Sequence, residues 1–283
     1  MSEERIIFCR AFDKEFHFES YGVRVKVESD SQDLLEEARQ AVVAGFVDRA
    51  VFIENGRIEP ERVFGVAFDG EQYLLFKDGE QVSSGKSAKN FFKILNSTLR
   101  VEVAEHADSK VFLHAGVVGW KGKAIVFPAK SFEGKSTLTA ELVKIGADYY
   151  SDEYAVLDER GYVHPFPRKI SMRYFGATRE KEVSIEEIGG KYGRDPLPVG
   201  MVLLTGFEKG GVWNPEVLSP GKGIFEIIPH TIPIRRKTEF SLKVLDLIAR
   251  RAIIVKSPRG DAKKFAKFLL AFFDNYINLV KLT

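Results

Sequence analysis

The residues best suited to chemistry lie between Ala129 and Glu153, where a loop ending in Gly-Lys-Ser precedes an acidic pair. The backbone N–H groups of such a loop, and the N-terminus of the helix after it, face an anion. A lysine at this place reaches the β- and γ-phosphates of a nucleotide, and the serine hydroxyl after it can bind Mg²⁺. The spacing therefore predicts a phosphate-binding loop with Lys135 and Ser136 as its functional side chains.

The flanking sequence predicts the elements that such a loop requires. An apolar run at 124–127 predicts a strand before the loop, and a second run at 111–118 predicts its antiparallel hairpin partner. After the loop, Leu138, Leu142 and Ile145 recur at helical spacing and predict a helix that ends near Gly146. The acidic pair follows this helix, so its carboxylates are expected at the same site.

The predicted phosphate-binding residues cover the whole loop and the first turn of the helix. Ala129 stands where glycine usually opens the loop, and Glu133 brings negative charge toward the phosphates. If Phe132 had positive φ, it would add strain of about 1 kcal/mol or more. The full set is Ala129, Lys130, Ser131, Phe132, Glu133, Gly134, Lys135, Ser136 and Thr137.

Three motifs come in an order and spacing that resemble the HPr kinase/phosphorylase family: His-Ala-Gly-Val-Val at 114–118, the loop at 129–136, and Ser-Asp-Glu at 151–153. The segment at 165–173 resembles the wider HPr-kinase-like group. The resemblance is clear over residues 110–175. It implies an α/β fold (α+β overall), with a mixed sheet in a P-loop kinase core of the kind shared with phosphoenolpyruvate carboxykinase.

The resemblance also implies roles for named residues. Lys135 is expected to hold phosphate, and Ser136 and Asp152 to hold Mg²⁺. Asp152 and Glu153 match the family's acidic pair, which handles the metal and the proton of the acceptor hydroxyl, with the strand histidine His114 nearby.

Two residues after the acidic pair can be compared with functional positions of the same family. Arg173 keeps a family arginine and is expected to contact phosphate, whereas Ser171 stands where the family has a carboxylate. The implied cofactors are ATP and Mg²⁺.

The leading hypothesis is a kinase that phosphorylates a hydroxyl, with serine as the preferred acceptor. The acceptor could be free serine or another small metabolite, or a serine on a protein. The departures at Ala129, Phe132 and Glu133 keep open a nucleotide-binding sensor or scaffold that transfers nothing. A carboxykinase-like reaction ranks third, because no cluster for a transition metal is evident. The donor (ATP, ADP or pyrophosphate), a reverse phosphorylase activity and a homo-oligomeric state stay open.

The overall composition argues against several classes of binding partner. The 42 basic and 40 acidic residues nearly cancel, which argues against nucleic acid or an anionic membrane as a partner. Cys9 is the only cysteine, so an intramolecular disulfide is excluded. With no apolar run long enough to span a membrane, a cytoplasmic protein is expected.

The pattern predicts three regions: a small α+β domain at 1–86, a connecting helix at 87–109, and the kinase-like domain at 110–283. A second Gly-Lys-Ser at 85–87 has Glu80 in the place of the first loop glycine and a turn at 78–80 in place of a buried strand, so it is interpreted as the approach to a helix. Within the kinase-like domain, 225–228 is predicted to be a strand. The polar, glycine-rich stretch at 176–198 is interpreted as a lid or acceptor loop.

Overall fold

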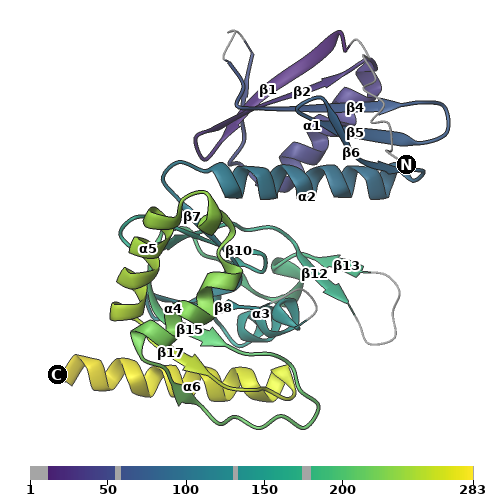
Figure 1. The fold of residues 1–283 in the computed structure, drawn as a ribbon. Coiled ribbons are helices and arrows are strands. Elements are labelled where there is room, and N and C mark those ends of the chain that lie inside the picture. Colours follow the sequence, from purple (N-terminus) through teal and green to yellow (C-terminus); the bar gives the residue numbers. More distant parts are fainter. Residues whose placement is uncertain (1–11, 55–58, 130–132, 174–179, 283) are drawn as a thin grey trace, which may run out of the picture. The chain divides into compact units, whose positions relative to one another are not determined.

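The computed structural model describes residues 12–54, 59–129, 133–173 and 180–282, with only the backbone described for Arg173, Glu180 and 280–282. The chain divides into two compact units, residues 1–109 and 110–283 (Figure 1). The described residues form a mixed α/β structure with several sheets and six α-helices. Lys130, Ser131 and Phe132 of the predicted loop lie outside the described residues.

The first unit is a six-stranded sheet of order β3-β1-β2-β4-β5-β6 with two helices packed on it. Phe18, Val25 and Phe64 of the sheet share one core with Leu35 of α1 and Leu95 of α2. Its elements are β1 (Lys14–Ser20), β2 (Val23–Ser29), α1 (Gln32–Phe46), β3 (Val51–Ile53), β4 (Arg62–Phe68), β5 (Tyr73–Lys77), β6 (Glu80–Gly85) and α2 (Ala88–His106).

Both helices of the first unit begin where a serine side chain caps the backbone. Ser31 accepts a hydrogen bond from the backbone N–H of Leu34 at 3.4 Å. Ser87, the last residue of the second Gly-Lys-Ser, accepts one from Asn90 at the same distance. The interpretation of that motif as a helix approach is confirmed. Helix α2 packs on α1, so it belongs to the first unit.

The second unit holds the predicted loop. Its elements are β7 (Val111–Trp120), β8 (Lys123–Pro128), α3 (Lys135–Lys144), β9 (Asp148–Ser151), β10 (Tyr154–Leu157), β11 (Tyr162–His164), β12 (Ile170–Arg173), β13 (Glu180–Val183), β14 (Lys191–Tyr192), β15 (Leu197–Leu204), β16 (Glu216–Val217), α4 (Pro220–Ile227), α5 (Thr238–Arg251), β17 (Ile253–Lys256) and α6 (Ala262–Leu282). Short 3₁₀ turns occur at Glu186–Ile188, Ile228–His230 and Ile232–Arg235.

The main sheet of this unit places several loops at one edge. Strand β8 pairs with β7 on one side and β15 on the other, and β15 continues to β17. Strands β8, β15 and β17 are parallel. Strand β7 is antiparallel to both β8 and β9, so β9 also runs in the direction of β8. The carboxyl ends of β9, β8, β15 and β17 therefore lie at the same edge of the sheet.

Helices cover both faces of this sheet. Strand residues alternate between two cores: Val117, Val126 and Val202 pack with α4 and α5. Their chain neighbours Val118, Ile125 and Met201 pack with α3 and α6. The alternation is the period-2 pattern of a strand that is buried on both faces. A three-layer arrangement of helices, sheet and helices supports the edge at which β8 ends.

Two predictions for this unit need correction. The apolar run at 225–228 is not a strand: α4 covers Pro220–Ile227, with Ser219 accepting at its N-cap and proline at its first position. A short apolar run does not distinguish a strand from a buried helix segment. The stretch at 176–198 is also not one loop, since its described part contains β13, a 3₁₀ turn, β14 and the start of β15.

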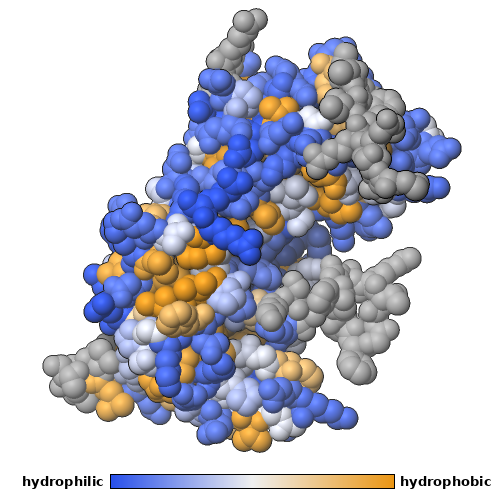
Figure 2. All heavy atoms as spheres, in the orientation of Figure 1, coloured by the Kyte–Doolittle hydropathy of each residue, from blue (hydrophilic) through white to orange (hydrophobic). Residues whose placement is uncertain are grey.

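No helix among the described residues has the length and apolar character to cross a membrane. The face drawn in Figure 2 is mostly hydrophilic, with apolar side chains in separate patches. Homo-oligomer formation stays a prediction.

Candidate functional site

The end of the predicted loop forms the N-terminus of α3. Gly134 caps the helix with φ of +82°, in the left-handed region that favours glycine. Lys135 and Ser136 are the first two helical residues, and Thr137 is exposed in the same turn. The helix therefore begins as the motif predicts, with the N–H groups of its first turn at the carboxyl end of β8.

Lys135 is buried at this end of the helix, with a relative exposure of 9%. Its Nζ donates a hydrogen bond to the carbonyl of Ala129, 2.8 Å away. Burial lowers the pKa of Lys135, and the negative charges of Glu133, Asp152 and Glu153 oppose that change. The amine is thus held beside the loop backbone, next to an acidic group of side chains.

The acidic pair lies between β9 and β10, beside the start of α3. The Ser136 hydroxyl donates to Oδ2 of Asp152 at 3.0 Å. The hydroxyl of Tyr149 lies 3.2 Å from Oδ1 of the same carboxylate. Burial, together with the charge of Glu153, raises the pKa of Asp152 to about 6. The structure therefore brings together the two residues for which the sequence predicted a metal role.

Glu153 is held by a different partner. Its carboxylate is paired with the guanidinium of Arg168. Its backbone carbonyl accepts from the N–H of Ala115 on β7 at 3.0 Å, which fixes the pair against that strand. The two neighbouring carboxylates consequently have distinct environments.

His114 lies on β7 beside the residue at which the pairing with β8 begins. It is opposite Tyr154 of β10, while the next residue, Ala115, is opposite Pro128 at the end of β8 on the other side of β7. This register places the histidine beside the start of the loop. Burial and the charge of Lys135 lower the pKa of His114 to about 4, so the ring is neutral at pH 7. A neutral histidine at this place can accept or donate a hydrogen bond without adding charge.

Arg173 is the one remaining predicted binding residue. Its backbone ends β12, opposite Glu180 of β13, and its side chain lies outside what the structure describes. The expected phosphate contact of Arg173 stays a prediction. Ser171 lies in the same strand, so the hairpin β12–β13 carries both positions.

The sequence reasoning did not single out Arg259, which follows β17 and has a relative exposure of 2%. Its Nη2 donates to the carbonyls of Gly134 at 2.8 Å and Glu133 at 3.2 Å. The only sequence signal is an arginine and a glycine directly after an apolar strand, a place where functional loops occur. Its approach to the loop depends on the order of strands, which the sequence alone does not show.

Two other groups in the first unit are weaker candidates. Glu102, Glu105 and His106 of α2 have ligand atoms close enough for a metal. However, the buried carboxylate of Glu102 is already paired with Arg62 at 2.7 Å and Lys77 at 2.5 Å, which is a structural arrangement.

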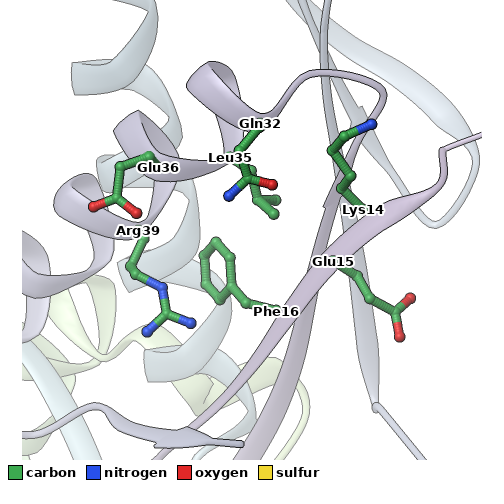
Figure 3. Close-up of a pocket in the computed structure, with 7 residues that line it drawn as sticks. All are labelled: Lys14, Glu15, Phe16, Gln32, Leu35, Glu36 and Arg39. Carbon is green, nitrogen blue, oxygen red and sulfur yellow. The ribbon is translucent and has the colours of Figure 1, made fainter.

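The second weaker candidate is a cavity of about 250 Å³ between β1 and α1 (Figure 3). Arg39 lies over the ring of Phe16 there, with 5.1 Å between guanidinium carbon and ring centroid. Acidic and basic side chains line the cavity together, which favours no single ligand charge. The lining residues are Lys14, Glu15, Phe16, Gln32, Leu35, Glu36 and Arg39.

No family model matches the chain, and no curated protein matches it. The resemblance to HPr kinases therefore rests on the residues of the site alone.

Proposed function

We propose that the second unit is an ATP- and Mg²⁺-dependent kinase domain that transfers a phosphoryl group to a hydroxyl, with a serine as the preferred acceptor. The observation that carries the proposal is the hydrogen bond from Ser136 to Asp152, with Lys135 one residue before Ser136. Phosphoryl transfer needs positioned phosphates, neutralising cations and a carboxylate near the acceptor. Residues suited to these needs lie at the carboxyl end of β8, and this supports the proposal: Lys135 for phosphate, Ser136 with Asp152 for a cation, and the carboxylate of Glu153.

The oxygen atoms of Ser136 and Asp152 fit Mg²⁺. Adjacent ligands of an octahedral Mg²⁺, each about 2.1 Å from the ion, lie about 3 Å apart. The separation of Ser136 Oγ from Asp152 Oδ2 is 3.0 Å. These two residues would hold the ion, which when bound neutralises charge on the phosphates. The fit supports the proposal because both atoms are hard oxygen ligands of the kind Mg²⁺ prefers.

The protein's own residues then have separable roles. Lys135 exchanges its bond to the Ala129 carbonyl for a bond to phosphate, and the N-terminus of α3 faces the same anion. With Asp152 on the metal side, Glu153 is the carboxylate that accepts the proton of the acceptor hydroxyl, oriented by Arg168. Neutral His114 borders the space in which that hydroxyl would lie.

One observation favours the second candidate, a nucleotide-binding sensor. The carboxylate proposed to take the proton, that of Glu153, is already occupied by an ion pair with Arg168. In a sensor, the ion pair between Glu153 and Arg168 would only stabilise the fold, and the nucleotide would bind without phosphoryl transfer. The two functions share the phosphate site and differ only in turnover.

Calorimetric titration with MgATP tests the site that both functions share. The wild type is expected to bind, and Lys135→Ala to bind at least tenfold more weakly. Because Lys135 is buried, circular dichroism of the variant checks that its fold is intact, so that the loss of affinity reports the missing amine. Equal affinity of both proteins for MgATP would overturn the proposal.

A further inference from the structure

The loop segments after β15 and β17 meet beside the predicted phosphate loop. The backbone N–H of Arg259 donates to the carbonyl of Gly206 at 3.1 Å, and that of Glu208 donates to the carbonyl of Arg259 at 2.8 Å. These bonds hold Phe207 and Arg259 in fixed register. Since Arg259 also donates to the carbonyls of Glu133 and Gly134, both segments are tied to the loop that begins α3.

Phe207 is an exposed aromatic residue at this junction. Its side chain is 57% exposed, although large apolar side chains are usually buried. A Cβ built on Gly134 would lie 3.9 Å from the Cβ of Phe207, so the ring begins directly beside the loop. The guanidinium carbon of Arg259 is 5.9 Å from the ring centroid, within cation–π distance. The guanidinium of Arg259 therefore contacts the ring of Phe207, and more than half of this side chain is exposed to solvent.

The order of strands decides which part of a nucleotide this ring would meet. Along the sheet edge, β9 with Asp152 and Glu153 lies on one side of β8, and β15 and β17 lie on the other. The phosphate that is transferred must face the acidic pair. A nucleotide whose phosphates lie at the end of β8 then directs its nucleoside toward β15 and β17. Ligands of parallel sheets bind at such carboxyl edges.

Two buried polar atoms at this flank have no hydrogen-bond partner among the residues that the structure describes. They are Nε of Arg259 and Oγ1 of Thr205, which directly follows β15. A buried polar atom without a partner is costly and is usually satisfied by a ligand or water. Both atoms lie on the flank away from the acidic pair.

We infer that Phe207, backed by Arg259, is the surface on which the base of the nucleotide stacks. This inference rests on the proposed function. Stacking on an aromatic ring tolerates any base because each base has a π-face. The platform would therefore increase affinity for nucleoside triphosphates over inorganic polyphosphate and distinguish little between adenine and guanine.

Binding of MgATP and of magnesium tripolyphosphate to wild type, Phe207→Ala and Phe268→Ala tests this inference. Phe268 is the matched control, since it is 62% exposed on α6. Both variants are expected to keep the wild-type thermal midpoint, because each removes an exposed ring. We expect Phe207→Ala to weaken MgATP binding about tenfold. Tripolyphosphate binding should be unchanged in it, and Phe268→Ala should match the wild type with both ligands.

The outcomes separate the two proposals. If the wild type binds both ligands and Phe207→Ala binds MgATP as tightly as the wild type, the stacking inference is wrong and the phosphate site stands. The stacking inference is also wrong if Phe207→Ala lowers the affinity for MgATP and the affinity for tripolyphosphate equally. If the wild type binds neither ligand, the proposed function is wrong, and the inference with it.

Discussion

The hydroxyl of Ser136 donates a hydrogen bond to Oδ2 of Asp152 across 3.0 Å, and so joins the start of α3 to the acidic pair after β9. The two residues come from different elements, and the parallel direction of β8 and β9 brings them to one sheet edge. Serine and carboxylate oxygens at this separation suit a Mg²⁺ ion bound with phosphate.

Removing the Ser136 hydroxyl should change the metal requirement. In Ser136→Ala, we expect the Mg²⁺ concentration for half-maximal nucleotide turnover to rise at least tenfold, because one of two proposed ligands is lost. Asp152→Asn should have a similar effect. Because both act on one pair, the double variant should show less than the product of the two single effects. Strictly independent effects would contradict a shared metal site.

The histidine on β7 should make stability depend on pH. The folded-state pKa of His114 is about 4, below its ordinary value of 6.5, so the unfolded chain binds this proton more readily. Its contribution to stability is complete above pH 6.5 and is lost as the pH falls toward 4. The loss amounts to at most about 3 kcal/mol. Urea unfolding at pH 7.5, 6.0 and 4.5 should show this slope in the wild type and a smaller one in His114→Gln. Equal slopes would contradict the assignment.

A side chain at Gly134 should destabilise the fold. Its φ of +82° is strained for alanine, and an added Cβ would overlap Nη2 of Arg259. Gly122 in the β7–β8 turn has φ of +76° and open space around it, so Gly122→Ala carries the backbone cost alone.

We expect Gly122→Ala to lower the free energy of unfolding by about 1 kcal/mol, and Gly134→Ala by about 2–3 kcal/mol. Chemical denaturation of both variants gives the comparison. Equal losses would show that the close contact between Arg259 and the loop contributes nothing to stability.

The local parts of the site could be predicted from the sequence because their signals are local. The hairpin of β7 and β8, the helix after the loop and its glycine cap follow from periodicity and from residue types within about twenty positions. The proximity of Ser136 and Asp152 was implied by the motif resemblance and is present in the structure. Whether they bind Mg²⁺ stays a prediction.

Long-range parts of the site could not be predicted. Arg259 reaches Gly134 from 125 residues away along the chain. This contact requires β17 to lie beside β15, which in turn lies beside β8. No local pattern encodes that order. The error at 225–228 has a different cause: a four-residue segment with three apolar residues fits a strand or a helix, and the N-cap signal of Ser219 and Pro220 was not weighed.

The measurement that tests the central claim most directly is ADP release from MgATP with a panel of hydroxyl compounds led by L-serine, for wild type beside Asp152→Asn. We predict acceptor-dependent ADP release by the wild type and a loss of at least about a hundredfold in the variant, with MgATP still bound by both. Acceptor-dependent turnover that is the same in wild type and Asp152→Asn would contradict the account. Tight MgATP binding with no transfer to any acceptor, including protein serines, would contradict the kinase and favour the nucleotide-binding sensor.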